Sequence, residues 1–354
     1  MNFTSDNSYG VAEPVMQAII AANRGPAASY GGDEWTARVV SRFRELFERE
    51  VEVHLVASGT AANAIGIASL VPPHGAVLCH AESHIYSEEC GACEFYSSGA
   101  RLAPVEGFAG KMTPDGLRRA LARFPGLRND LVASAVSLTE ASECGTLYRP
   151  DEIVALARIA HGTGLGVHMD GARFANAVAA LGVSPADLTW RAGVDVMSFG
   201  ATKNGAMAAE AVIVFDAARV RDLPFRRKRG GHVLSKLRFL AAQLEACLTD
   251  GLWLGLAAHA NAMAARLAAG LGALEPVRLP WPTEANEVFA LMPKGVAEAL
   301  RARGAAFHDW TTVGLAGTRW EPGAGECLVR LVASFATAEG DVDSFLALAS
   351  ELTA

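Results

Sequence analysis

The sequence predicts an α/β protein with a large, mostly parallel sheet domain and a smaller C-terminal α/β domain. From about residue 35 to residue 245, short β-branched apolar runs alternate with longer Ala- and Leu-rich amphipathic runs, as in parallel sheets with crossover helices. The pattern changes after residue 215, and at roughly 150 residues per domain the 354 residues suggest about two domains. We expect an N-terminal segment over 1–13, a large domain over 14–250 and a small domain over 251–354.

The short apolar runs are the expected strands. In the large domain they cover residues 53–57, 76–79, 101–104, 132–138, 166–169, 194–199 and 211–215. Helices are clearest over 60–70, which follows a Ser-Gly turn, and over 149–163, which precedes a turn that bears Gly. The spacing leaves room for one crossover helix between successive strands.

The chain beyond residue 215 begins with a basic run over 225–229 (FRRKR), and a long helical run follows through 252–274. Three prolines between 276 and 282 break this helix. The remainder predicts two strands and two helices. The strands are expected over 288–292 and 328–334, and the helices over 297–303 and 340–353.

Composition limits the classes of function. The hydrophobic set makes up 51% of the chain, and 38 acidic against 31 basic side chains give a net charge of -7, which disfavours sequence-independent binding to nucleic acid or anionic membrane. The six cysteines are scattered, and the single pair Cys90 and Cys93 lacks a second pair for a zinc site. The polar N-terminus and the lack of an 18-residue apolar run predict neither export nor a membrane span. We expect a cytoplasmic protein with a small-molecule partner and no metal.

Three strings that follow predicted strands carry residues suited to chemistry. Ser58, Gly59 and Thr60 open a helix, where free N–H groups favour an anion, although a simple helix cap would have the same sequence. Asp170, in HMDGARF, either faces the crevice at the carboxyl edge of the sheet or caps the next helix. Lys203, in SFGATKNG, is either an amine suited to Schiff-base chemistry or an exposed loop lysine.

Together these strings suit pyridoxal 5'-phosphate (PLP), which needs a lysine for its aldehyde, an acid for its ring nitrogen and a cradle for its phosphate. With SDNSYG, SGTAAN, ESHIYSEECGA and VRLVASF, the chain resembles the L-threonine aldolases of the β-eliminating lyase family along almost its whole length. The resemblance implies the aspartate aminotransferase-like fold of fold-type I PLP enzymes. It also implies cleavage of the Cα–Cβ bond of L-threonine, L-allo-threonine or other 3-hydroxy-L-amino acids, such as phenylserine, to glycine and an aldehyde.

The resemblance implies a cofactor role for each matching residue. Lys203 would bind the PLP aldehyde, and Asp170 would pair with the pyridine nitrogen. The phosphate would lie at Ser58, Gly59 and Thr60.

The resemblance also implies roles around the substrate. Arg173 would lie near the phenolic oxygen of the cofactor, and His84 would stack on its ring and take part in proton transfer. Ser5, in the N-terminal segment, and Arg330 would hold the substrate carboxylate. Each has a structural alternative: an interior histidine for His84, a turn residue for Ser5 and a surface strand charge for Arg330.

A neighbouring subunit is implied as well. In this family the site is built across a dimer interface, so Tyr30, beside the substrate, and Lys228, beside the phosphate, would come from a partner in a dimer or tetramer. The alternative for the basic run around Lys228 is a solvated charged face.

One departure concerns the general base. Many relatives carry a histidine in a Leu-Glu-Asn-Thr-His string, whereas residues 137–143 here contain none and end in Glu143. Deprotonation of the substrate hydroxyl would then fall to His84, Glu143 or a water. A dehydratase-type β-elimination from serine or threonine, and a non-catalytic PLP-binding protein, share the cofactor residues and remain the alternatives.

Overall fold

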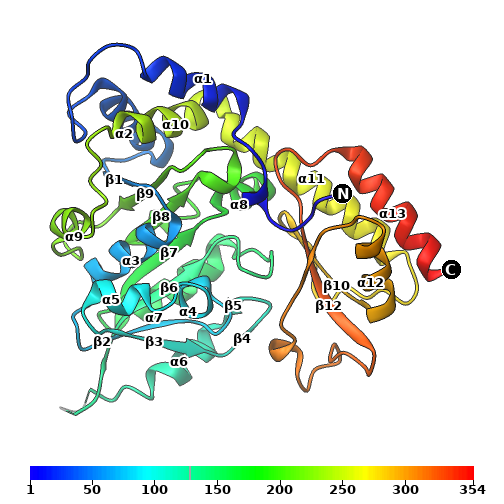
Figure 1. Ribbon diagram of the computed structural model, residues 1–354. Helices are drawn as coiled ribbons and strands as arrows, with labels where there is room; N and C mark the ends of the chain where they lie inside the picture. The colour runs from blue at the N-terminus through cyan, green and yellow to red at the C-terminus, as the bar shows by residue number, and fades with distance from the viewer. Residues whose placement is uncertain (127–128) are drawn as a thin grey trace.

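A mixed sheet forms the centre of the larger lobe in the computed structural model, which describes residues 1–126 and 129–354 (Figure 1). Its order is β1-β9-β8-β7-β6-β2-β3, and all neighbours are parallel except β9, which is antiparallel to both β1 and β8. All seven predicted strands are present, with boundaries that agree to about two residues. They are β1 (Glu52–Val56), β2 (Gly75–His80), β3 (Arg101–Val105), β6 (Val132–Thr139), β7 (Gly166–Gly171), β8 (Val196–Gly200) and β9 (Glu210–Val214).

Helices surround this sheet. Helix α3 is buried from Ala61 to Ser69, because its sequence is almost entirely small and apolar, and it packs against β8 and β9 as well as α5 and α9. The basic run 225–229 is helical and lies within α9. The helices of the larger lobe are α1 (Glu13–Ala22), α2 (Glu34–Phe47), α3 (Gly59–Leu70), α4 (His84–Ser87), α5 (Ala92–Ser97), α6 (Pro114–Leu121), α7 (Pro150–Gly162), α8 (Phe174–Leu181), α9 (Leu223–Arg229) and α10 (Arg238–Leu248).

The smaller lobe is built on an antiparallel sheet of order β10-β12-β11. The long helix α11 leads into it from the larger lobe (Figure 1). The predicted strands 288–292 and 328–334 correspond to β10 and β12, whereas β11 and the β4–β5 hairpin are too short for a periodic pattern to predict. These elements are β10 (Glu287–Pro293), β11 (His308–Asp309), β12 (Glu326–Val332), α11 (Leu252–Gly272), α12 (Lys294–Ala302) and α13 (Glu339–Thr353), with β4 (Gly107–Phe108) and β5 (Lys111–Met112) in the larger lobe.

The first residues of the chain lie against the smaller lobe. The N–H of Phe3 donates to the carbonyl of Ala306 (2.7 Å), and the carbonyl of Phe3 accepts from Val332 (2.9 Å). The Phe3 ring is fully buried beside Phe345. This anchoring carries the next residues, around Ser5, back toward the larger lobe.

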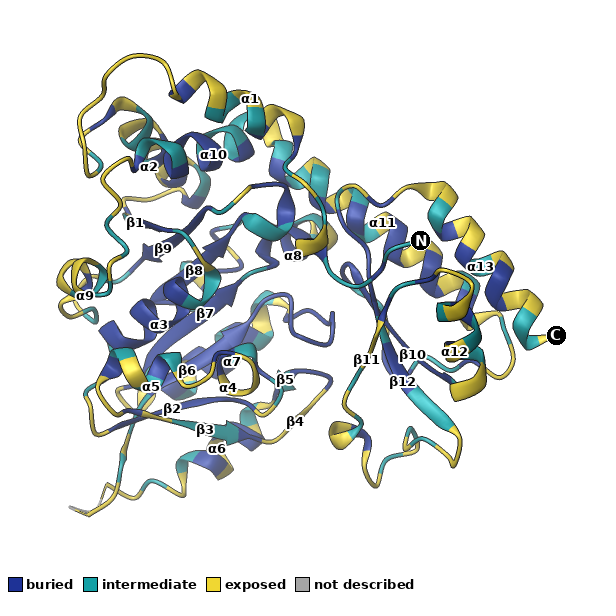
Figure 2. Ribbon diagram, viewed as in Figure 1, coloured by how far each residue is buried: buried dark blue, intermediate teal, exposed yellow. Residues whose placement is uncertain are grey.

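Burial follows the sheets. The strands of the large sheet are mainly buried, and exposed residues gather on the outer faces of helices such as α1 and α13 (Figure 2). Within residues 1–126 and 129–354, no helix is both long and apolar enough to cross a membrane.

Candidate active site

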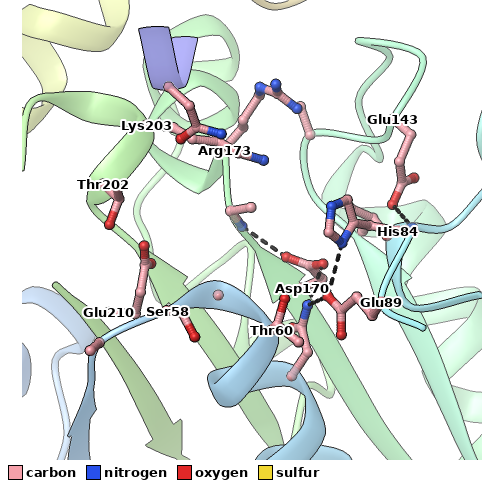
Figure 3. A pocket seen from close by; sticks show the side chains of 17 residues that line it. Ser58, Thr60, His84, Glu89, Glu143, Asp170, Arg173, Thr202, Lys203 and Glu210 are labelled. Atoms are coloured by element: carbon pink, nitrogen blue, oxygen red, sulfur yellow. Dashed lines mark hydrogen bonds and ion pairs between the residues drawn. The ribbon is translucent and has the colours of Figure 1, made fainter. Parts of the chain in front are cut away.

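Functional side chains gather at the carboxyl edge of the large sheet. Strands β1, β2, β6, β7 and β8 run in the same direction, so the loops that follow them meet at this edge. These loops and the C-terminal end of β7 bring Ser58, His84, Glu143, Asp170 and Lys203 to the wall of one cavity of about 270 Å³ (Figure 3). The structure thus brings together residues that the sequence placed in five separate strings.

The N-terminal end of α3 forms one wall of this cavity. The Ser58 hydroxyl caps the helix by accepting from the N–H of Ala61 (3.3 Å). Gly59 and Thr60 form the first turn and also line the cavity, where their N–H groups have no partner within the helix. The cap and the anion cradle are therefore compatible interpretations of this string.

Asp170 lies at the end of β7 and is 2% exposed. Its carboxylate accepts from the side chain of Asn63 (2.8 Å) and from the N–H of Ala172 (3.0 Å). It does not cap α8, which begins at Phe174, so the helix-cap alternative is wrong. Within the described part of the chain, no Lys or Arg pairs with Asp170. A buried carboxylate without a cation favours a ligand that supplies one.

His84 is held by a network that the sequence did not predict. Its Nδ1 lies 2.9 Å from Oε1 of Glu89, whose side chain is fully buried. Asn63 donates to the same Glu89 oxygen (2.9 Å) and to Asp170, so one amide joins the two carboxylates. The hydrogen bond that His84 donates to Glu89 raises the pKa of His84 above its usual value. The charge of Asp170 raises it as well, whereas burial lowers it. The sequence offered one sign of this network: Asn63 is a single amide side chain in the otherwise small and apolar sequence of α3.

Glu143 lies beside His84. Its carboxylate accepts from the backbone N–H of His84 (2.6 Å) and is buried, and burial together with the charge of Asp170 raises its pKa to about 7. Glu143 thus titrates near neutral pH, in the range that suits a general base, and it lies beside His84.

A second cavity, of about 220 Å³, continues from the first. Lys203, His84, Glu143 and Arg173 line both cavities, which makes them two parts of one site. The second cavity also has walls from the N-terminal segment and the smaller lobe. Ser5 belongs to the N-terminal segment, and Trp310 and Arg330 belong to the smaller lobe, whereas Glu82 and Glu88 flank α4 in the larger lobe.

The two arginines differ in how fully their guanidinium groups are used. Arg173 donates to both carboxylate oxygens of Asp6 (2.8 and 3.1 Å) and pairs with Glu287 (3.2 Å). Arg330 pairs only with Glu287 among the described residues, at 3.8 Å, and lies over the Trp310 ring at 4.5 Å. Its donors are therefore more available to a ligand than those of Arg173.

Buried carboxylates that the sequence analysis missed surround these arginines. Burial raises the pKa of Glu287, and the charges of Arg173 and Arg330 only partly offset it. For Asp6 the balance is reversed: burial acts to raise its pKa, but Arg173 and Lys203 lower it below its usual value. The arginines thus lie in a region where positive and negative charges nearly compensate.

Glu210 is a further missed residue, on the first cavity. Burial raises its pKa to about 7, and it accepts from the N–H of Ala201 (3.2 Å). It reaches the carboxyl edge of the parallel strands because β9 runs antiparallel and begins there.

Two predicted residues lie apart from both cavities of their own chain. The Lys228 ammonium is 5.0 Å from the centroid of the Tyr30 ring, and both side chains are exposed. Neither lines the first or the second cavity. Of the two cysteines with CxxC spacing, Cys90 is exposed and Cys93 is buried. No group of three or more metal-ligating side chains occurs in the described ranges.

Comparison with known proteins connects this geometry to a family. The family model described as "Beta-eliminating lyase" matches residues 2–294. The chain is 44% identical to a low specificity L-threonine aldolase of Pseudomonas aeruginosa and 41% identical to one of a Pseudomonas species, over 90% of this chain and 91% of each relative. The structure matches a threonine aldolase of Leishmania major with a TM-score of 0.91 and 28% identity, over 100% of this chain and 99% of the other. This match confirms the predicted fold class.

Proposed function

Since the chain belongs to the β-eliminating lyase family, we propose that it is a PLP-dependent aldolase that cleaves the Cα–Cβ bond of L-threonine and related 3-hydroxy-L-amino acids. One observation carries the proposal. The cavity with Lys203, Asp170 and the α3 N-terminus opens into a second cavity in which Arg330 has free donors. A cofactor and an amino acid carboxylate can thus be held side by side.

The residues of the first cavity fit PLP. Lys203 would hold the aldehyde, and the turn from Ser58 to Thr60 would bind the phosphate. Asp170, which is buried and has no Lys or Arg partner among the residues that the structure describes, would hold a proton on the ring nitrogen. When bound, PLP supplies an electron sink for the pair left at Cα as the Cα–Cβ bond breaks.

Substrate orientation falls to the second cavity. Arg330, with Ser5 on the same wall, would bind the carboxylate through two parallel hydrogen bonds and so fix the rotation of the amino acid about Cα. Arg173, already bound to Asp6, would instead stabilise the wall and face the cofactor's oxygen substituent. The Cα–Cβ bond then takes the orientation that favours its cleavage.

Proton transfer from the β-hydroxyl falls to His84 or Glu143. Both side chains line the second cavity, and the Glu143 carboxylate accepts a hydrogen bond from the backbone N–H of His84. Glu89 holds the His84 ring in one orientation. The departure from the family's histidine string is thereby compensated by a carboxyl group whose pKa is near 7.

We further propose a cytoplasmic homo-oligomer. Support for shared sites comes from the exposed pair of Tyr30 and Lys228, which lies outside the cavities of its own chain. A partner's pair would then reach the substrate and phosphate.

Product analysis tests the reaction. L-Threonine, L-allo-threonine and L-phenylserine should each give stoichiometric glycine and aldehyde, the aldehyde being measured with a coupled dehydrogenase. Ammonia and 2-oxobutyrate from threonine, without glycine, would replace the aldolase by a dehydratase. A yellow, borohydride-reducible protein with neither set of products would be a non-catalytic PLP-binding protein.

A further inference from the structure

A third cavity, of about 650 Å³, adjoins the substrate cavity. It lies between the β4–β5 hairpin of the larger lobe and residues 309–314 of the smaller lobe. The second and third cavities share Glu82, Ser87, Glu88 and Trp310 as wall residues, so one opens into the other. Threonine has only a methyl group beyond its hydroxyl carbon, and cleavage of threonine makes no use of this space.

The walls of the third cavity are partly apolar. Phe108, on the hairpin, is 44% exposed, and Val313, on the smaller lobe, is 81% exposed. Trp310 separates this space from the carboxylate site, because its ring also contacts the Arg330 guanidinium. Apolar side chains that border a cavity at a substrate site favour a ligand with an apolar body.

The charged groups of the third cavity all have one sign. Its acidic wall residues are Glu82, Glu88, Glu106 and Asp309, and no Lys or Arg of the described ranges 1–126 and 129–354 lines it. Glu106 and Asp309 each pair with an arginine outside the cavity. Glu82 and Glu88 pair with no Lys or Arg in the part of the chain that the structure describes. His80, whose imidazole also lines the wall, is uncharged at neutral pH because burial lowers its pKa to about 4.

We propose that the third cavity receives the side chain of larger 3-hydroxy-L-amino acids and selects those that combine an apolar body with a positively charged end. This inference rests on the proposed function and names its substrate class. The apolar walls bury the body of the side chain. The carboxylates of Glu82 and Glu88, which have no Lys or Arg partner among the described residues, attract a cation and repel an anion in a partly desolvated space.

A charge series on one scaffold tests this selection with the PLP-loaded enzyme. The substrates are L-threo-phenylserine and its 4-aminomethyl and 4-carboxy analogues. We expect kcat/KM for the 4-aminomethyl compound to exceed that for the 4-carboxy compound by about tenfold or more at low ionic strength. The ratio of these two kcat/KM values should decrease as salt is added, because salt screens the charges. The matching phenylalanine analogues, which lack the hydroxyl and are not cleaved, should follow the same order as competitive inhibitors.

Three variants locate the effect. Glu88→Gln, at an exposed position, should reduce the ratio of the two kcat/KM values several-fold. Glu82→Gln should reduce this ratio more than Glu88→Gln does. Glu298→Gln, which removes an exposed charge from α12 outside the cavity, should leave the ratio unchanged. Equal kcat/KM for all three substrates, or a ratio that neither cavity variant alters, would overturn the inference. If threonine still gives glycine in that case, the proposed function stands; if no substrate gives glycine, both fail.

Discussion

The proposed cofactor side of the site, which is the first cavity, and the proposed substrate side, which is the second cavity, are built in different ways. On the cofactor side, Ser58, Asp170 and Lys203 each lie at or just after the C-terminal end of a strand of one sheet, so the folding of that sheet places all three. On the substrate side, Ser5 comes from the N-terminal segment and Arg330 from the smaller lobe. The first side therefore depends on one sheet, and the second on the meeting of two lobes and a chain terminus.

Buried ion pairs join the parts of the substrate side. Arg173 of the larger lobe binds Asp6 of the N-terminal segment and Glu287 of the smaller lobe, and all three are nearly or fully buried. Removing one partner of such a group leaves an uncompensated buried charge. Substitutions on the two sides should consequently separate into loss of the cofactor and loss of substrate orientation.

The largest effect is expected on the cofactor side, from Lys203→Ala. Without the amine there is no covalent attachment of the aldehyde, and turnover should fall by about three orders of magnitude or more. Borohydride reduction followed by peptide mass analysis measures the attachment. Lys236→Ala, at an exposed position outside the cavities, is the control. A borohydride-reducible adduct with full activity in Lys203→Ala would show that another lysine is the anchor.

Asp170→Asn should follow, with a loss in kcat of about 10²- to 10³-fold. The amide can still accept from Asn63, but it cannot hold a proton on the ring nitrogen, so the cofactor should remain partly bound while the electron sink weakens. Absorbance and steady-state rates measure the two effects. Asp187→Asn, on the surface, is the control. Near-normal turnover would leave Asp170 with a structural role only.

The same contrast explains what the sequence could predict. Asp170 and Lys203 follow apolar runs that predict strands, so local pattern and the geometry of parallel sheets are enough to bring them together. Glu210 was not predicted as a site residue, because a strand pattern does not reveal in which direction the strand runs. Strand β9 is antiparallel to its neighbours, so its first residue lies at the site.

The other missed residues had no local signal in the sequence. Glu287 is a single acid at the start of an apolar strand, and its partners Arg173 and Arg330 lie in other parts of the chain. Asn63 and Glu89 meet only because α3 packs against α4 and α5, and Glu89 lies between these two helices. Such contacts depend on tertiary packing, which periodicity and turn residues do not specify.

A smaller effect is expected from Arg330→Ala, on the substrate side. It should retain the cofactor's absorbance but lower kcat/KM by about 10- to 100-fold, with KM raised and kcat reduced, because a charged hydrogen bond to the carboxylate contributes both affinity and orientation. Spectral titration with glycine measures affinity separately from turnover. Arg303→Ala, exposed at the end of α12, is the control. Unchanged glycine affinity in Arg330→Ala would place the carboxylate site elsewhere.

The smallest effect, and the one that joins the two sides, is expected from Glu89→Gln. Glu89 raises the pKa of His84 by accepting its hydrogen bond, so the neutral, proton-accepting imidazole predominates only above that raised value. A neutral glutamine lowers the pKa, and the acidic limb of the kcat/KM profile should move to lower pH, with a rate loss of about tenfold or less.

Glu143→Gln provides the comparison that assigns this limb. The Glu143 pKa of about 7 also lies within the pH range that such a rate profile covers. A carboxylate base would likewise be active only above its pKa. If His84 is the base, Glu89→Gln shifts the acidic limb of the kcat/KM profile to lower pH, and Glu143→Gln leaves an acidic limb in the profile. If Glu143 is the base, Glu143→Gln abolishes the limb, whereas Glu89→Gln leaves its position unchanged. A purely structural role for Glu89 would lower the rate equally at every pH, and that result would contradict the positioning of His84 by this carboxylate.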